Sequence, residues 1–486
     1  ARVRGARVLV VGAGAAALTA AWRLRQAGVD VRVADAQTRT GGRMLSLRGH
    51  FADGQVAELG GELVDTGHAR IRALAAELGL ALDDLRTGEP FEEVWHVGGA
   101  RRTEAEVVAA WAPVAALVAR DLRGLDVDAV GWRRPALGAA LDRVSVAEWL
   151  ETRGVGGWMR DLLRVAYTTE FGIEPDRQSS LNLLTLIDPA PDAFRVFGDS
   201  DERFHVRGGN DLIVRGLAER LGESTFTLGR RLVALSPGAG GGWRATFDGD
   251  GGPSTADATH VVLAVPFTLL REVRLDAPLP PAQRRAIAEL GYGTNAKLMV
   301  GFGERVWRTR HAANGSVLTD RPFQLTWETS RGQDGRAGIL TNFTGGARGV
   351  ALGNGTPAER AADLARELDP ILPGAAAARD GREARFHWPS HPWTRGSYAS
   401  YLAGQWTAVR GAEGLASGTL HFAGEHTSRE AQGFMEGGCE SGERAAREVL
   451  SSLGVRAAVS PFLRRERALR TDRRRAVRDA VEALLA

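Results

Sequence analysis

The stretch that decides the fold is VLVVGAGAAALTAAWRLRQAGVDVRVAD, residues 8–35. Four apolar residues lead into the small-residue turn GAGAAA, a helical pattern follows, and a second valine-rich segment ends at Asp35. This order predicts a strand, a tight turn, a helix and a parallel strand. In such a unit the N–H groups at the start of the helix bind a pyrophosphate.

The small residues of the turn have different tasks. Gly12 allows the tight turn, Gly14 lets the backbone approach the pyrophosphate, and Ala17 lets the helix pack closely on the strand. Asp35, 23 residues after Gly12, is placed to bind the ribose hydroxyls of an adenosine. The pattern therefore predicts a bound dinucleotide. The alternative is a parallel unit whose glycines only make a turn.

Length and composition limit the class of protein. A chain of 486 residues with 44% hydrophobic residues fits an α/β protein of two or three domains. The formal net charge of +3 does not predict nucleic-acid binding. The longest apolar run, residues 261–270, is too short for a membrane span. The single cysteine, Cys439, excludes an internal disulfide and a thiolate metal cluster, and no metal site is expected.

The cellular compartment stays open on this evidence. A chain without cysteine pairs is stable in either redox environment, so both the cytoplasm and export remain possible. The sequence begins with Ala and shows no signal peptide. Export would therefore imply that a leader is removed before this form arises.

Among the 62 basic residues there is one lysine, Lys297. Arginine serves everywhere else, which indicates that position 297 needs a compact ammonium or one that can lose its proton. A planar guanidinium with a permanent charge supplies neither property. Chance survival of one lysine is the alternative.

Two further glycine-rich segments follow the opening unit. Residues 40–44, TGGRM, form a second turn in which Gly42 precedes Arg43, and the arginine suits a phosphate. Residues 56–65 read as a short strand that ends at Gly60 and Gly61. A flat ligand can lie against a backbone without side chains at that point.

Near the end of the chain a strand at residues 419–422 delivers Glu425 to its carboxyl end, where open α/β sheets bind ligands. The segment that follows, predicted as a helix, has an unusual number of glycines, and each costs about 1 kcal/mol relative to alanine in a helix. We therefore expect another element to approach it closely. The glycines are Gly433, Gly437, Gly438 and Gly442.

The segments predict a discontinuous organisation. Residues 1–84, 205–270 and 410–454 are expected to form a Rossmann-like nucleotide-binding domain. Residues 85–204 and 271–409 are expected to form an α+β substrate domain with a mixed sheet, in which residues 85–204 are a helical insertion. Helix starts are predicted at Ser145, by its capping box with Glu148, and at Thr356.

The last segment, residues 455–486, is an Arg-rich tail that reads as a helix. Its apolar positions indicate that it packs on the body or on a second copy of the chain, which would make a homodimer. Contact with an anionic surface is a weaker alternative.

With these motifs the chain resembles the flavin-containing amine oxidase family, in its bacterial form, which includes monoamine, polyamine and L-amino-acid oxidases. The resemblance covers about residues 5–452. It rests on GAGAAALTAAWRL with Asp35, TGGRM at 40–44, ELGGE at 58–62, NAKL at 295–298, and FAGEHTS followed by QGFMEGGCESGERAA within 422–446. The expected fold class is α/β, with a discontinuous FAD-binding domain and an α+β substrate domain.

The resemblance implies bound FAD. The implied cofactor contacts are Gly12, Gly14, Ala17, Asp35, Gly42, Arg43, Gly60, Gly61, Glu62, Leu232, Glu425 and Met435. Glycines and Asp35 would hold the adenosine diphosphate, Leu232 would contact adenine through its backbone, and residues 60–62 would run beside the flavin ring. Ser397 stands where mitochondrial monoamine oxidases carry the cysteine that links the flavin. The FAD is therefore expected to be non-covalent.

The resemblance also implies the reaction. Lys297 matches the family lysine that holds a water near flavin N5, and Tyr398 and Phe434 match the aromatic positions that flank the substrate amine. Hydride passes from the carbon bearing the amine to the flavin, the imine hydrolyses to a carbonyl compound, and oxygen reoxidises the flavin to give hydrogen peroxide. The partners are a small amine or amino acid and molecular oxygen.

The substrate class stays open at this point. Amino-acid oxidases place an arginine shortly after the LG pair to bind the carboxylate, whereas this chain has Glu62 and Leu63, which favours an amine without a carboxylate. Glu62, Glu170 and Glu328 are candidates for binding a polyamine. The alternatives are an L-amino-acid oxidase that makes a 2-oxo acid and a flavin-bound interaction protein without turnover.

Overall fold

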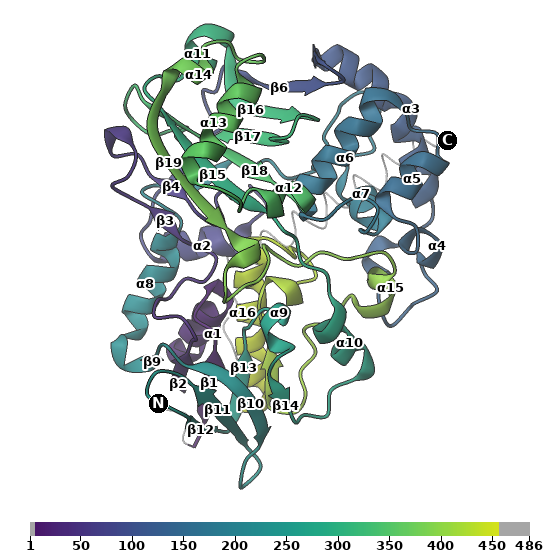
Figure 1. Cartoon of the computed structure of the whole chain (residues 1–486). Coiled ribbons are helices and arrows are strands. Elements are labelled where there is room, and N and C mark those ends of the chain that lie inside the picture. The colour runs from purple at the N-terminus through teal and green to yellow at the C-terminus, as the bar shows by residue number, and fades with distance from the viewer. Residues whose placement is uncertain (1–4, 456–486) are drawn as a thin grey trace.

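The opening stretch folds as a strand, helix and strand at the centre of a parallel sheet. The structure, a computed structural model, describes residues 5–455. The sheet has the order β20-β13-β1-β2-β9, and every neighbouring pair in it is parallel. Strands β13, β1, β2 and β9 are labelled in Figure 1. The predicted Rossmann-like fold is confirmed. The elements are β1 (Arg7–Val11), α1 (Ala15–Gln26), β2 (Asp30–Ala34), β9 (Phe226–Thr227), β13 (His260–Leu263) and β20 (Leu420–Phe422).

Helix α16 (Met435–Ser452) packs directly on α1 (Figure 1), and this contact explains its glycines. A Cβ atom on Gly442 would lie 2.3 Å from the carbonyl oxygen of Ala16, and one on Gly438 would lie 3.4 Å from Ala15 Cβ. The approaching element that the glycines predict is therefore α1. Gly433 lies before the helix, with φ of 88°, and so has a separate role in the turn.

A seven-stranded mixed sheet forms the second half of the molecule, in the order β19-β15-β18-β17-β16-β6-β7. Only β16 and β6 pair in parallel; the other pairs are antiparallel. The strands are β6 (Glu92–Val97), β7 (Ala100–Arg102), β15 (Ala296–Phe302), β16 (Ala313–Thr319), β17 (Leu325–Glu328), β18 (Gly338–Thr344) and β19 (Arg379–His387). Strands β6 and β7 lie in the stretch for which the sequence predicts helices, because their signal comes from pairing with a distant strand.

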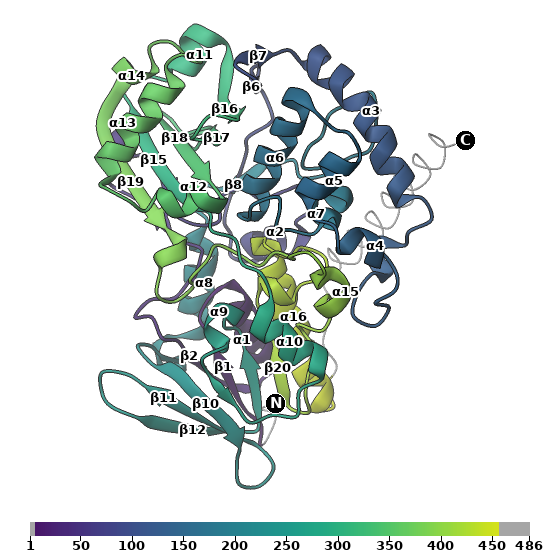
Figure 2. The same ribbon diagram turned by 45° about the vertical axis from the view of Figure 1, so that its right-hand side comes forward.

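The helices of residues 104–186 stand beside this sheet (Figure 2). They are α3 (Glu104–Leu122), α4 (Ala139–Asp142), α5 (Val146–Thr152), α6 (Gly157–Phe171) and α7 (Ser180–Leu186). Trp111 and Trp149 are fully buried among them. The capping box of Ser145 and Glu148 at the start of α5 is present as predicted, and so is the Thr356 cap of α13.

The remaining elements complete the two halves. A four-stranded sheet has β10 (Arg231–Pro237), β11 (Trp243–Asp248), β12 (Ser254–Ala258) and β14 (Arg274–Leu275); the two-stranded sheets are β3 (Ser46–Leu47) with β4 (Ala57–Glu58) and β5 (Leu82–Asp84) with β8 (Phe204–Val206). The other helices are α2 (Ala69–Glu77), α8 (Asp211–Leu221), α9 (Phe267–Leu270), α10 (Pro281–Glu289), α11 (Val306–His311), α12 (Gly346–Ala351), α13 (Pro357–Leu368), α14 (Ala375–Ala378) and α15 (Gln405–Val409).

Within residues 5–455, none of the helices combines the length and the apolar character that crossing a bilayer requires. The Arg-rich tail lies almost entirely outside the described residues, so its helix and its role in a homodimer stay predictions. The boundaries between the two domains also stay a prediction.

We expect Gly442→Ala to lower the free energy of unfolding by about 1–3 kcal/mol, because the added methyl group would push α16 away from α1. Helix propensity alone predicts the opposite, a gain of about 1 kcal/mol. Urea unfolding followed by circular dichroism measures the difference. Gly156→Ala is the control, since its Cβ would meet no atom within 4 Å. A Gly442→Ala variant more stable than the parent would contradict the proposed contact.

Candidate active site

One cavity of about 570 Å³ lies between the parallel sheet and the seven-stranded sheet and is lined by segments of both. All the residues that the sequence singles out for a cofactor or for chemistry line it, although they come from segments far apart in the chain. They are Gly12, Gly14, Ala17, Asp35, Gly42, Arg43, Gly60, Gly61, Glu62, Leu232, Lys297, Tyr398, Glu425, Phe434 and Met435.

Asp35 lines the cavity and also holds the glycine turn after β1 in place. Its carboxylate accepts hydrogen bonds from the backbone N–H of Ala13 and of Gln37, both at 2.6 Å. Burial raises the pKa of Asp35, although these two hydrogen bonds act in the opposite direction. Gly12 has φ of 111°, and a Cβ there would lie 2.6 Å from the carbonyl oxygen of Ala264. The turn is therefore rigid and needs glycine at this position.

Arg43 and Glu425 form an ion pair that joins the second glycine turn to the segment before α16. Arg43 Nη1 donates to Glu425 Oε1 at 2.8 Å and to the carbonyl oxygen of Ser397 at 2.7 Å. Glu425 Oε2 accepts a hydrogen bond from the N–H of Gly433 at 2.9 Å. The Ser397 hydroxyl donates to Asn295 Oδ1 at 2.7 Å. This cluster shapes the middle of the cavity and balances the charge of Arg43.

The glycine pair at 60–61 forms a backbone wall without side chains. A Cβ on Gly60 would lie 1.8 Å from the carbonyl oxygen of Arg43, and one on Gly61 would lie 2.6 Å from Met435 Sδ. Trp388 Nε1 donates to the carbonyl oxygen of Leu59, next to the wall, at 2.9 Å. Any side chain here would displace the Arg43 backbone or the side chain of Met435. A planar ligand can lie against such a surface.

Lys297, on β15, reaches this wall and is 3% exposed. Its Nζ donates to Glu62 Oε2 at 2.5 Å and to the carbonyl oxygen of Gly60 at 3.0 Å. The ammonium also lies 5.3 Å from the centre of the Trp327 ring. Burial opposes ionisation of Glu62, but Lys297 and the hydrogen bonds around it outweigh burial, so that the pKa of Glu62 lies below its ordinary value.

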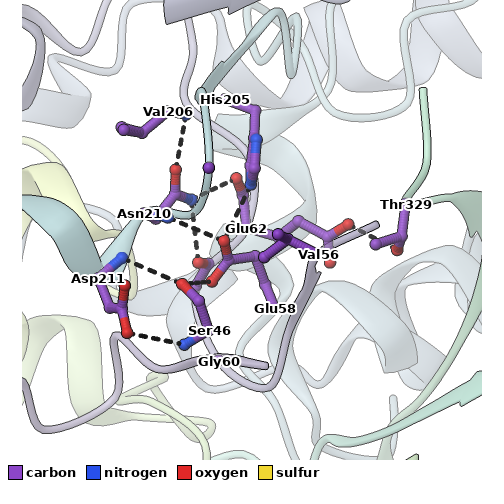
Figure 3. A network of polar contacts seen from close by, with 12 residues as sticks. Ser46, Val56, Glu58, Gly60, Glu62, His205, Val206, Asn210, Asp211 and Thr329 are labelled. Carbon is purple, nitrogen blue, oxygen red and sulfur yellow. Dashed lines mark hydrogen bonds and ion pairs between the residues drawn. The ribbon is translucent and has the colours of Figure 1, made fainter. Parts of the chain in front are cut away.

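A second polar network, centred on Glu58, holds the backbone on both sides of the glycine wall (Figure 3). Glu58 is completely buried; its carboxylate accepts hydrogen bonds from His205 Nε2 at 2.9 Å, the N–H of Asn210 at 2.8 Å and the Ser46 hydroxyl at 2.8 Å. Asn210 Nδ2 then donates to the carbonyl oxygen of Glu62 at 2.6 Å. The start of α8 and the strand β4 thereby fix the backbone that carries Glu62.

Tyr398 and Phe434 line the cavity with a group of acidic side chains beside them. The Tyr398 hydroxyl donates to the carbonyl oxygen of Glu170 at 2.5 Å. The Phe434 ring centre lies 5.1 Å from that of His68, whose Nε2 is 3.4 Å from Asp65 Oδ2. Burial, and secondarily the charges of the nearby acids, raise the pKa of Tyr398 well above its ordinary value, so the phenol stays neutral.

Two acids that line this part of the cavity, Glu170 and Glu202, have raised pKa values, and so does Asp65 near them. Burial, reinforced by repulsion from neighbouring acids, raises the pKa of Glu170 to about 8, of Glu202 to about 7 and of Asp65 to about 6. Glu202 has an exposed side chain, but it borders the cavity, where surrounding protein still limits its solvation. The carboxylates of Glu170 and Glu202 form no hydrogen bond or ion pair with any residue in the described part of the chain.

Several of these residues are not recognisable in the sequence as parts of a site. Glu58, His205, Asp65 and Glu202 come together only through contacts between distant segments, and Trp327 and Thr329 read as ordinary residues of a strand and its exit. The ELGGE motif with two acids around the glycine pair was the one local signal. Glu328, a candidate for binding a polyamine, instead accepts hydrogen bonds from Trp307 at 2.8 Å and Arg308 at 2.5 Å and does not line the cavity.

The residues present fit a flavin dinucleotide. The first turn offers backbone N–H groups and Asp35 for an adenosine diphosphate, and Arg43 lies between this turn and the glycine wall. The wall at Gly60 and Gly61 has no side chains and faces Lys297, which suits a flat ring. An elongated ligand with a charged middle and a planar end therefore matches the lining.

Comparison with known proteins agrees with this fit. Residues 16–450 match the family model described as flavin containing amine oxidoreductase. The chain is 28% identical over 461 residues to a Mycobacterium tuberculosis protein named as a flavin-containing monoamine oxidase, AofH, covering 92% of this chain and 97% of the relative.

Two solved structures share the fold. Cyclohexylamine oxidase from Brevibacterium oxydans has a TM-score of 0.80 with 23% identity, and putrescine oxidase bound to putrescine has a TM-score of 0.77 with 25% identity. Each of the two matches covers 92% of this chain and 99% of the solved chain. The similarity therefore extends over both halves of the molecule and not only over the nucleotide-binding unit.

The buried pair of His205 and Glu58 predicts pH-dependent stability. Burial disfavours the charged imidazole, but Glu58 outweighs this effect and raises the pKa of His205 above 6.5. The pair of protonated His205 and Glu58 therefore stabilises the folded protein fully below about pH 6.5, the pKa of histidine in the unfolded chain. This stabilisation is lost as the pH rises through the higher pKa that His205 has in the folded protein. We therefore expect His205→Gln to lower the free energy of unfolding by about 1–2 kcal/mol at pH 6 and by less at pH 9.

Urea unfolding at the two pH values measures this effect, with the exposed His50→Gln as the control. An equal loss at both pH values would show that the His205 side chain stabilises the protein through packing and not through its charge.

Proposed function

This chain belongs to the flavin-containing amine oxidoreductases, and on that premise we propose that it is an FAD-dependent oxidase of small amines. The observation that carries the proposal is the meeting of Lys297, Tyr398 and Phe434 at one cavity, opposite a glycine wall. These residues are separated widely in the sequence and converge where a planar cofactor would lie. The one lysine of the chain is among them.

The cofactor that the lining supports is FAD and not a shorter flavin. Asp35 and Leu232 belong to the part of the cavity that an adenosine would fill, and Arg43 would meet the phosphates. Gly60, Gly61 and Met435 would hold the flavin ring. When bound, the flavin accepts a hydride from the carbon bearing the amine and passes the electrons to oxygen, which gives hydrogen peroxide.

The protein side chains position the reacting groups. Tyr398 and Phe434 would hold the neutral amine and exclude water. Lys297 would place a water with the N–H that remains after its bonds to Glu62 and Gly60. The imine product then takes up water and yields a carbonyl compound and ammonia or a smaller amine. Overall, the reaction consumes one amine, one oxygen and one water. It forms one carbonyl compound, one ammonia or smaller amine, and one hydrogen peroxide.

The acids around the aromatic pair favour an amine without a carboxylate. Glu170 and Glu202 line the cavity, and a bound cation would favour their ionised forms and be stabilised by them, whereas a substrate carboxylate would keep them protonated and gain no counter-charge. The basic groups nearest the glycine wall are already paired, Lys297 with Glu62 and Arg43 with Glu425. A substrate that carries a second ammonium fits this distribution better than an amino acid. The similarity to putrescine oxidase supports the same choice.

We expect the FAD to leave the protein completely on acid precipitation, because Ser397 offers a hydroxyl, already donated to Asn295, in place of a reactive thiol. Absorbance of the supernatant and chromatography against FAD and FMN standards measure both the release and the identity of the flavin. Flavin retained in the washed pellet would contradict non-covalent binding. Released FMN would contradict the adenosine contacts proposed for Asp35 and Leu232.

We expect peroxide from primary amines and α,ω-diamines and little from amino acids, measured with a coupled peroxidase assay on one panel. Glu170→Gln should raise KM for a diamine roughly tenfold, the effect of about 1.4 kcal/mol, and change KM for the monoamine of equal length much less. Glu151→Gln, an exposed acid on α5, is the matched control.

Three results would overturn parts of this proposal. Peroxide from amino acids alone would identify an L-amino-acid oxidase. If, under anaerobic conditions, no amine reduces the bound flavin and bleaches its yellow colour, the result would favour a flavin-bound protein without turnover. Bleaching without peroxide would indicate an acceptor other than oxygen.

A further inference from the structure

In the part of the chain that the structure describes, two of the three N–H groups of Lys297 have a protein acceptor and one has none. An ammonium has three N–H groups. One donates to Glu62 Oε2 and a second to the carbonyl oxygen of Gly60. Among residues 5–455 no further acceptor lies within hydrogen-bond distance of Nζ, and Lys297 lines the cavity. The third N–H is therefore available to a group inside the cavity.

The hydrogen bonds of Glu62 leave one defined carboxylate oxygen to accept from Lys297. Its Oε1 accepts hydrogen bonds from the Thr329 hydroxyl at 2.7 Å and from Trp327 Nε1 at 2.9 Å. Its Oε2 is left for Lys297, and Asn210 fixes the backbone carbonyl of the same residue. Each oxygen atom of Glu62 thus has its own partner, and the side chain cannot rotate without breaking several hydrogen bonds.

Because this pair is buried, Lys297 needs the negative charge of Glu62 in order to stay protonated. The side chains of Lys297 and Glu62 are 3% and 5% exposed. A charge buried to that degree without a partner is strongly disfavoured, and a lysine in that situation releases its proton. The other charged group that acts on Glu62 is His205, which is bound to Glu58. Among residues 5–455, Glu62 is therefore the only anionic partner of Lys297.

We propose that Glu62 is a positioning residue that keeps Lys297 as an ammonium and orients it so that one N–H faces the cavity. The pair then presents a directed hydrogen-bond donor next to the glycine wall without adding a net charge there. The inference rests on the proposed function for the reaction that the donor serves, but the charge and orientation of Lys297 do not depend on which amine is the substrate.

An arginine at position 297 could not take this role. The Glu62 oxygen and the Gly60 carbonyl converge on one nitrogen, whereas a guanidinium spreads its donors over a plane. The neighbouring Trp327 ring, 5.3 Å from Nζ, also limits the space for a larger head group. This geometry supplies a physical reason for the lysine among 61 arginines.

The single lysine makes the proposal directly measurable. Protein grown with [ε-13C]lysine contains one labelled side chain, and its carbon shift reports whether the amine is protonated. In the flavin-loaded protein we expect the lysine of Glu62→Gln to lose its proton at a pH at least one unit lower than the lysine of the parent. Glu62→Asp, which keeps the charge, should restore most of the difference.

The matched control is Glu328→Gln, which removes another fully buried acid that hydrogen-bonds to Trp307 and Arg308 instead. It should leave the lysine titration unchanged. If Glu62→Gln also leaves the titration unchanged, the proposal is overturned. The second readout is reaction of the reduced protein with oxygen in stopped flow, which we expect to slow at least tenfold in Glu62→Gln above the pH at which its lysine is neutral.

These outcomes separate the two proposals. A shifted titration with an unchanged rate of flavin reoxidation would support the role of Glu62 toward Lys297 and would show that the charge of Lys297 does not assist the reaction of the reduced flavin with oxygen. A protein that oxidises no amine would still show the shifted titration if Glu62 holds the lysine as inferred.

Discussion

The ion pair between Glu62 and Lys297 is the interaction on which the arrangement of the cavity depends. Glu62 follows the glycine wall of the nucleotide-binding half, and Lys297 extends from the seven-stranded sheet of the other half. The two side chains are 235 residues apart in sequence, yet their charged atoms lie 2.5 Å apart and nearly out of contact with water. A buried pair of this kind requires both halves to dock in one register, since displacement would leave two unpaired charges in an apolar setting.

Close backbone approach makes this docking possible. Gly60 and Gly61 let the wall lie against the Arg43 backbone and Met435, and Gly442 lets α16 lie against α1. The same glycines that cost helix or strand stability thus bring the start of α16 to the cavity. Met435 and Phe434 reach it because no side chain separates the two helices behind them. Packing and site geometry are consequences of the same small residues.

Local patterns in the sequence predicted the parts of the fold whose signal is local. The β1-α1-β2 unit, strand β15 and the capping boxes at Ser145 and Thr356 need only neighbouring residues to be recognised. The sequence predicts a helical stretch where strand β6 lies, because the strand depends on pairing with β16, more than two hundred residues away. The lone lysine indicated a special position from composition alone.

What the sequence could not predict is which charges meet. The His205–Glu58 pair spans 147 residues, and the hydrogen bond from the Glu202 N–H to Asp65 spans 137. No short motif contains either pair. Consequently the ELGGE motif predicts that residues 60–62 lie beside a flavin but contains no signal that Glu62 pairs with Lys297. Glu170 and Glu328 looked equivalent in the sequence, but only Glu170 faces the cavity.

Charged side chains are distributed unevenly in the cavity: they are paired around the glycine wall, whereas acids predominate beside Tyr398. Around the glycine wall the basic groups Arg43 and Lys297 are matched by Glu425 and Glu62, so that region has directed hydrogen-bond donors but little net charge. Beside Tyr398, in contrast, Glu170 and Glu202 have no basic partner within hydrogen-bond distance in the described residues. In the proposed reaction an amine cation would favour the ionised forms of these acids, and a carboxylate formed in this way could then accept the proton that the amine must lose before it reacts. Under that proposal the two acids would provide both the counter-charge for the amine and the acceptor for its proton.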